Sequence, residues 1–364
     1  MVAYDEQIAE LEKRISSTKY NKSTQHAIGL YKAQIAKLRE KQEARSSSGK
    51  GGEGYQVRKT GDGTVILLGF PSVGKSTLLN AITDAHSPVG AYEFTTLTVI
   101  PGVLDYSHAK IQILDVPGIV RGAASGRGRG KEVLACMRNA DMAILLVDVR
   151  KPEQHEYLVK EAFDVGIRFN QKRPDVRIKK TGKNGIRVGT TVKLTKLDKQ
   201  TITDMFKEFR INNADVVIRE DISDDQLIDC IEDNKKYMPA IFVMNKADLL
   251  SPDNLKSLQR RYHPDLIVSA EQKEHMEELK RLIFERLNII RIYMKEPGKP
   301  ADMNIPLIAF KGWKVEDVCN KLHRDFVKKF KFCRIWGKSA KFDGQKLALH
   351  HVLKDEDVLE LHLN

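Results

Sequence analysis

Residues Gly69-Phe70-Pro71-Ser72-Val73-Gly74-Lys75-Ser76 fit the pattern GxxxxGK[ST], which wraps backbone amides around a phosphate. The segment follows an apolar run, Thr64–Leu68, that predicts a buried strand, and it opens a helix predicted over Lys75–Thr83. Lys75 is expected to place its charge on the β- and γ-phosphates, and Ser76 is expected to ligate Mg²⁺. The residues expected to bind the phosphates are Gly69, Pro71, Ser72, Val73, Gly74, Lys75, Ser76 and Thr77.

The second motif, Asp115-Val116-Pro117-Gly118, ends a strand predicted at Lys110–Leu114, which is expected to pair antiparallel with Thr98–Tyr106. Asp115 is placed to hold Mg²⁺, and the Gly118 amide is placed to sense the γ-phosphate. A DxxG sequence is common, but one at a strand end about forty residues after the phosphate loop indicates a nucleotide switch.

Two loops are predicted to respond to the γ-phosphate. In Phe94–Leu97 (FTTL), Thr96 is favoured over Thr95 as a ligand that reaches Mg²⁺ only when the γ-phosphate is present. The glycine-rich stretch Gly118–Gly130 suits a second switch, whose arginines serve phosphate or RNA or are simply solvated. The residues expected to act in catalysis are Lys75, Thr96 and Gly118, and those expected to hold the metal are Ser76, Thr96 and Asp115.

A third motif, Asn245-Lys246-Ala247-Asp248, directly follows a strand predicted at Ala240–Met244. The Asp248 carboxylate can accept hydrogen bonds from both donors on the guanine edge, whereas adenine offers a lone pair there and is repelled. Ser269–Ala270 follow the strand predicted at Leu266–Val268 and can give an amide to guanine O6. The residues expected to bind the base are Asn245, Lys246, Asp248, Ser269 and Ala270.

Strands and helices alternate around these motifs, with a further strand at Ala143–Val149 and helices at Pro152–Val165 and Glu271–Leu287. This pattern predicts an α/β fold with a mostly parallel sheet and helices on both faces. The interval between Gly166 and Met238 is too long for a simple crossover, so it predicts an inserted α+β domain. Its expected elements are strands Val176–Lys180 and Ile186–Leu194 paired as a hairpin through Asn184–Gly185, a helix at Lys199–Phe209 and a strand at Ala214–Arg219.

Both ends of the chain form their own elements. Two apolar stripes, Ile8 to Ile15 and Ile28 to Leu38, predict an antiparallel helical hairpin before a linker at Ser46–Gly54. The last segment predicts a β-grasp domain. Its expected elements are strands Pro306–Phe310, Phe332–Trp336 and Val358–Leu363, a helix at Val315–Val327, and a turn at Asp343–Gly344.

Charge and composition constrain the partners. The 364 residues carry a net charge of +12, of which residues 1–60 and 291–364 hold +5 each. The charge at both ends fits either an RNA partner or a surface that keeps the protein soluble, and the sequence does not decide between them. Within the insertion, residues 167–199 hold 11 basic and 2 acidic groups, and Lys321–Arg334 interleaves basic and aromatic residues. No apolar run is long enough for a membrane span, so a soluble cytoplasmic protein is expected. The four cysteines form no CxxC pair and are expected to be small buried thiols.

Together, GFPSVGKST, FTTL, DVPGIVRGAASGRGRG and NKAD resemble the Obg GTPase superfamily, and the flanking segments resemble its developmentally regulated GTP-binding protein (DRG) family. The resemblance implies a cytoplasmic P-loop GTPase that associates with ribosomes in translation and is stabilised by a regulatory partner protein. It also implies a helix-turn-helix-like N-terminus, a ribosomal-protein-like insertion and a TGS domain. The expected boundaries are 1–58 for the helical region, 59–166 with 239–290 for the GTPase domain, 167–238 for the insertion and 291–364 for the TGS domain.

The residue after the DxxG motif leaves the mechanism open. Many GTPases place a water-orienting glutamine where this chain has Ile119, so slow GTP hydrolysis is expected. Relatives with potassium-stimulated hydrolysis carry an asparagine where this chain has Ser72, so the resemblance implies K⁺ without fixing its ligand. A GTPase switch is the first hypothesis, and a nucleotide-stabilised protein that binds RNA or a partner with little turnover is the alternative. An ATPase is disfavoured by Asn245 and Asp248.

Overall fold

The structure is a computed structural model that describes residues 2–19, 21, 24–47, 61–83, 100–115 and 136–364. The predicted switch threonine Thr96, the glycine Gly118, Ile119 and residues 48–54 of the predicted linker lie outside these residues. The chain divides into two compact units. The smaller unit comprises residues 1–54, 121–131 and 161–237, and the larger unit comprises residues 55–120, 132–160 and 238–364.

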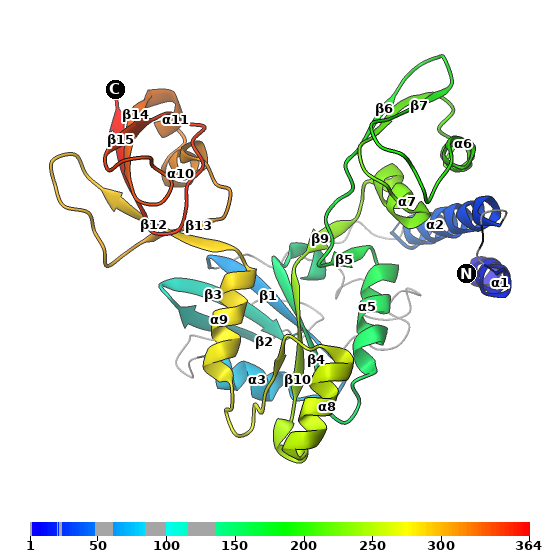
Figure 1. Cartoon of the computed structure of the whole chain (residues 1–364), viewed down its shortest axis with the longest axis horizontal. Coiled ribbons are helices and arrows are strands. Elements are labelled where there is room, and N and C mark those ends of the chain that lie inside the picture. Colours follow the sequence, from blue (N-terminus) through cyan, green and yellow to red (C-terminus); the bar gives the residue numbers. More distant parts are fainter. Residues whose placement is uncertain (1, 20, 22–23, 48–60, 84–99, 116–135) are drawn as a thin grey trace. The chain divides into compact units, whose positions relative to one another are not determined.

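A six-stranded sheet forms one part of the larger unit (Figure 1). Its strands are β1 (Gly63–Leu68), β2 (Ile100–Tyr106), β3 (Ala109–Asp115), β4 (Met142–Asp148), β10 (Ala240–Asn245) and β11 (Leu266–Ile267). The order is β11-β10-β4-β1-β3-β2, and every neighbouring pair is parallel except β2 and β3. The predicted mostly parallel sheet and its antiparallel pair are confirmed. Because parallel strands end at the same edge, this order gathers the carboxyl ends of β1, β3, β4, β10 and β11.

Helices cover both faces of this sheet, as predicted. The helices beside this sheet are α3 (Lys75–Ile82), α5 (Gln154–Asp164), the 3₁₀ helix η2 (Ala247–Leu249), α8 (Pro252–Tyr262) and α9 (Met276–Arg286). The boundary between the two units falls within α5, after residue 160. Side chains alternate along β10, so Ile241 and Val243 join the core beneath α3 and α9. Phe242 points to the opposite face, where its ring stacks on His155 of α5 with centroids 3.9 Å apart.

The chain after Asn288 forms a second sheet, which has the predicted β-grasp arrangement. Its elements are β12 (Ile289–Lys295), β13 (Leu307–Phe310), α10 (Val315–Leu322), α11 (Phe326–Lys329), β14 (Phe330–Trp336), β15 (Gln345–Leu347) and β16 (Asp357–Leu363), in the order β13-β12-β16-β14-β15. Val318 and Cys319 of α10 pack into the sheet's core. The single helix predicted over Val315–Val327 is wrong, because His323 adopts an extended conformation that ends α10.

The smaller unit contains the predicted inserted elements together with the N-terminal helices. Its elements are α1 (Val2–Ser17), α2 (Gln25–Ser47), β5 (Ile167–Phe169), β6 (Val176–Lys180), β7 (Ile186–Thr190), α6 (Lys199–Glu208), β8 (Ala214–Ile218), α7 (Asp224–Glu232) and β9 (Lys236–Met238). β6, β8 and β7 form one sheet, and β5 and β9 form a two-stranded ribbon.

The hairpin predicted from Val176–Lys180 and Ile186–Leu194 is wrong. β8 lies between these strands, antiparallel to β6 and parallel to β7. The turn itself is present, since Asn184 and Gly185 have φ values of 82° and 67°. The Gly185 amide, however, donates to the Asn213 side chain at 2.8 Å, which ties this turn to the start of β8 instead of closing a ladder.

The N-terminal helices pack against each other and against the insertion. Gln42 of α2 donates to Asp5 of α1 at 2.8 Å, and Arg39 of α2 pairs with Glu12 of α1, which fits the predicted antiparallel hairpin. Ala33 of α2 is fully buried in the core formed by α6, α7 and β8. α2 therefore completes the hydrophobic core of the insertion, a contact that its sequence pattern did not indicate.

Candidate nucleotide-binding site

The segment between β1 and α3 has the backbone shape that a phosphate loop needs. Gly74 has a φ of 93°, and a Cβ there would lie 2.4 Å from Asn245 Nδ2. A Cβ on Gly69 would lie 2.5 Å from the carbonyl oxygen of Leu146. Both positions therefore require glycine for packing, and Gly74 requires it for conformation as well.

The Lys75 side chain lies along this loop. Its Nζ donates to the carbonyl oxygens of Gly69 and Phe70 at 3.1 and 3.2 Å. Burial lowers the pKa of Lys75, because water no longer solvates the ammonium fully. The two carbonyls hold the ammonium at the loop, where an anionic group would raise this pKa again.

Asn245 joins the phosphate loop to the predicted base-binding segments. Its Nδ2 donates to the Val73 carbonyl at 2.9 Å, and its Oδ1 accepts from the Ala270 amide at 3.0 Å. The side chain is only 2% exposed, so all three segments are fixed to one another through a buried amide.

The Asp248 carboxylate is exposed at the same edge of the sheet. Ser269 is fully buried, and its hydroxyl donates to Asp248 Oδ1 at 2.5 Å. The same hydroxyl accepts from the Gln272 amide at 3.2 Å. Ser269 therefore orients the carboxylate that the sequence predicts to read guanine.

The sequence interpretation missed Asp148, which ends β4. Lys246 Nζ donates to the Ser72 carbonyl at 2.6 Å and pairs with Asp148 Oδ2 at 3.0 Å. Arg150 donates to both oxygens of the same carboxylate, at 2.9 and 2.6 Å, and together with Lys246 it holds the pKa of Asp148 well below its usual range. The signal available in the sequence was a carboxylate ending an apolar strand beside the other motif-bearing strands.

Known proteins are similar in sequence to this chain over nearly its whole length. The chain is 48% identical, over 99% of its length and 93% of the relative, to an uncharacterized GTP-binding protein of Methanocaldococcus jannaschii. It is 42% identical to the developmentally-regulated GTP-binding protein 2 of Homo sapiens, over 98% of both chains. The chain belongs to the developmentally regulated GTP-binding protein family. It is therefore a GTP-binding protein with a P-loop GTPase domain and a TGS domain.

Three family models match consecutive ranges of this DRG-family chain. Residues 64–180 match the family described as "50S ribosome-binding GTPase", residues 183–289 match the C-terminal region of that domain, and residues 290–363 match the TGS domain. A solved GTP-binding protein from Pyrococcus horikoshii aligns with 83% of this chain and all of its own at 14% identity, with a TM-score of 0.43.

Two of the three residues predicted to hold Mg²⁺ in the DRG-family chain, Ser76 and Asp115, lie among the described residues and suit that ion. The Ser76 hydroxyl donates to Asp115 Oδ2 at 2.7 Å, so the two predicted ligands lie together. Asp115 is buried, and its Oδ1 has no partner among the described residues. A hydroxyl beside an unsatisfied carboxylate oxygen is a donor set that Mg²⁺ prefers, and this ion usually takes its other ligands from phosphates and water.

The remaining predictions concern the cysteines, a membrane span and the two switch residues. All four cysteines are free and buried, as predicted. No helix among the described residues is both long enough and apolar enough to cross a membrane. Thr96 and Gly118 lie outside the described residues, so their predicted roles remain predictions.

Proposed function

We propose that this protein hydrolyses GTP to GDP and phosphate slowly, as a Mg²⁺-dependent switch. The proposal depends most on one observation: the buried Asn245 side chain holds the phosphate loop and the base-binding segments in one hydrogen-bonded network. Within it, Lys75 would bind the β- and γ-phosphates, Ser76 and Asp115 would hold Mg²⁺, and Asp248 would accept from guanine. Thr96 and Gly118 are proposed to respond to the γ-phosphate.

The bound metal would neutralise charge on the phosphates and orient them. The chain itself offers no glutamine after the DxxG motif, because Ile119 stands there. The attacking water would have to be ordered by backbone groups, by K⁺ or by a partner protein. Slow turnover follows from that absence.

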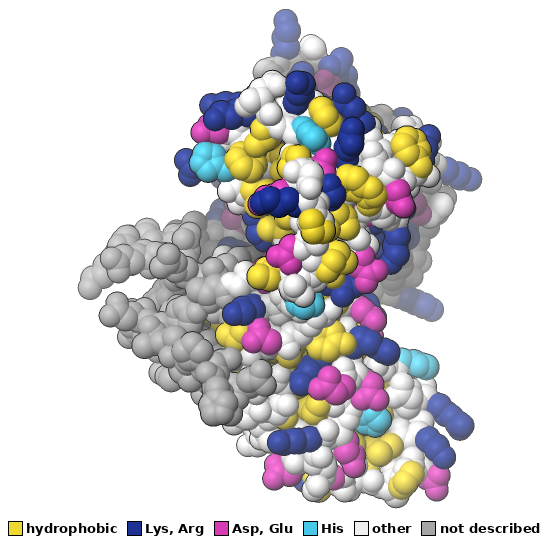
Figure 2. All heavy atoms as spheres, turned by 90° about the vertical axis from the view of Figure 1, so that its left-hand side faces the viewer, with side chains coloured by type: hydrophobic (Ala, Val, Ile, Leu, Met, Phe, Trp, Pro, Cys, Tyr) yellow, Lys and Arg dark blue, Asp and Glu magenta, His cyan; other side chains and the backbone are white. Residues whose placement is uncertain are grey.

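We further propose that the protein associates with the ribosome and acts in translation, with a regulatory partner protein. The match to a family described as ribosome-binding supports this proposal. The TGS domain adds exposed cations, among them Lys328, Lys329 and Lys331, next to a stacked pair of rings, Phe332 and His362, 4.2 Å apart. Figure 2 shows many lysines and arginines interspersed with exposed hydrophobic side chains in the upper part of the view, a mixture that suits RNA contact.

The first test is steady-state release of phosphate from GTP. We expect slow release that requires Mg²⁺ and stops with a chelator, and we expect it to rise in KCl relative to NaCl at equal ionic strength. Ser76→Ala should reduce turnover in saturating GTP by about tenfold or more, because the metal loses a ligand beside Asp115. Absence of release in either salt would favour the alternative, a nucleotide-stabilised RNA- or partner-binding protein.

A further inference from the structure

The sheet formed by β6, β8 and β7 has one covered and one open face. Alternate side chains, Val176 and Ile178 on β6 and Ile186 and Val188 on β7, pack into the core with α6, α7 and α2. The opposite positions on the two edge strands are Arg177, Lys179 and Arg187, and all three are exposed. We call these three side chains the basic face.

The basic face has almost no acidic counterpart. Asp215 on β8 is the one acidic side chain at an outward position of the three strands, and it already pairs with Arg187 at 2.7 Å. Arg177 and Lys179 form no ion pair with any described residue. The loops that adjoin these strands also carry exposed lysines without an ion pair among the described residues: Lys172, Lys183, Lys193 and Lys196.

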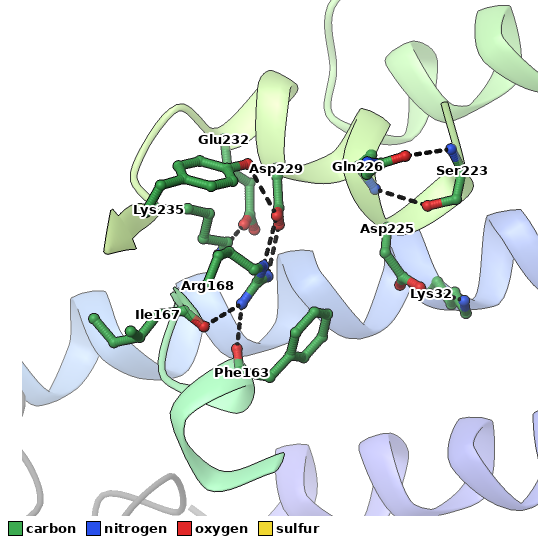
Figure 3. Close-up of polar contacts among 11 residues, drawn as sticks. Lys32, Phe163, Ile167, Arg168, Ser223, Asp225, Gln226, Asp229, Glu232 and Lys235 are labelled. Carbon is green, nitrogen blue, oxygen red and sulfur yellow. Dashed lines mark hydrogen bonds and ion pairs between the residues drawn. The ribbon is translucent and has the colours of Figure 1, made fainter. Parts of the chain in front are cut away.

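The acidic residues of the same unit are used elsewhere. Figure 3 shows Arg168 bound to Asp229 and Lys32 bound to Asp225, on and around α7. Lys32 also pairs with Asp224 at 3.0 Å. Internal cations therefore neutralise much of the acidic helix, whereas Arg177 and Lys179 of the basic face have no ion-pair partner among the described residues and are free to meet an external anion.

The composition of the basic face favours phosphates over bases. Besides the three cations and Asp215, the outward positions of the strands hold Val217 and Gly189, so no aromatic ring is available for stacking. Arg177 and Lys179 are two residues apart on one strand, about 7 Å, which lets them contact separate phosphate groups. A surface of this kind binds a nucleic-acid backbone by charge, without reading its sequence.

We propose that the basic face docks on the phosphate backbone of a double-helical segment of RNA. The choice of RNA rests on the proposed ribosome association, and an A-form helix presents its backbone along a wide, shallow groove. This surface is separate from the nucleotide site in sequence and in chemistry. Its binding should therefore be strongly salt-dependent and insensitive to RNA sequence.

The test measures how salt weakens binding to a mixed-sequence RNA duplex of about 20 base pairs, followed by fluorescence anisotropy of the labelled RNA. Arg177→Gln/Lys179→Gln should reduce the slope of log Kd against log[KCl] by about two, because each lost phosphate contact removes about one. The matched control is Lys256→Gln/Arg260→Gln on α8, which removes the same charge from an exposed helix with no buried residues. The control should keep the parent slope.

GDP affinity, measured on the same proteins, separates this proposal from the proposed function. If the parent protein does not bind GDP, the proposed GTPase function fails but the RNA site does not. If the double variant keeps the parent's salt slope for RNA binding, the RNA site is overturned. Equal losses in variant and control would also overturn it, and so would competition by polyglutamate as strong as that by unlabelled RNA, which would indicate an acidic protein partner. Should the double variant fail to fold, Lys179→Gln alone should lower the slope by about one.

Discussion

Replacing Lys75 by alanine is expected to weaken binding of GDP and GTP by about 100-fold, or roughly 3 kcal/mol. In the parent protein two loop carbonyls hold this ammonium beside glycines that leave room for a phosphate. Without it, the phosphates would lose a charge-assisted hydrogen bond inside a partly desolvated loop. Calorimetric titration at fixed Mg²⁺ measures the change.

The control for this prediction is Lys110→Ala, which removes the same charge from an exposed position of β3 in the same unit. It should leave nucleotide affinity near that of the parent. Parent-like affinity in Lys75→Ala would contradict the assigned phosphate site.

Arg168→Met should lower the free energy of unfolding of the smaller unit by about 3–5 kcal/mol. Both oxygens of Asp229 accept from Arg168, each at 2.6 Å, and the two side chains are each only 4% exposed (Figure 3). The guanidinium also lies 3.6 Å from the centre of the Phe163 ring and donates to the Phe163 carbonyl. The substitution would leave a carboxylate buried without its charged partner, and urea denaturation followed by circular dichroism would report the loss.

Two further variants show whether the effect arises from the buried charge. Arg168→Met/Asp229→Leu should recover most of the stability, because it removes both charges from the buried site. Arg219→Met breaks an ion pair with Asp175 whose side chains are 46% and 60% exposed, so it should change little. If Arg168→Met were as mild as Arg219→Met, the interpretation of the buried pair would be wrong.

Local motifs explain why the segments of the proposed nucleotide site could be expected to lie together. The phosphate loop, Asp115 and Asn245 each end a strand, and parallel strands bring their ends to one edge whatever the rest of the chain does. Ser76 and Asp115 accordingly lie 2.7 Å apart although 39 positions separate them. Asp148 ends β4 in the same way, but a lone carboxylate carries no motif to single it out.

Non-local pairing explains the failures. Asn184–Gly185 does form a turn, but local signals cannot show that β8, about thirty residues later, inserts between the flanking strands. The place of Ala33 in the insertion's core depends on contacts with residues more than 160 positions away. The helical spacing of α2 can indicate which of its faces is buried, but not which distant element buries it.

The most direct measurement is a calorimetric comparison of GDP, a non-hydrolysable GTP analogue and the matching ATP analogue, with Mg²⁺, on the parent protein and on Asp248→Asn. We expect one site per chain, with guanine nucleotides bound at least about 100-fold more tightly than the ATP analogue. Asp248→Asn should abolish most of that preference, since the amide cannot accept both guanine donors as the carboxylate does. ATP binding as tight as that of GTP in the parent, or an unchanged preference in Asp248→Asn, would contradict a guanine site at this edge of the sheet.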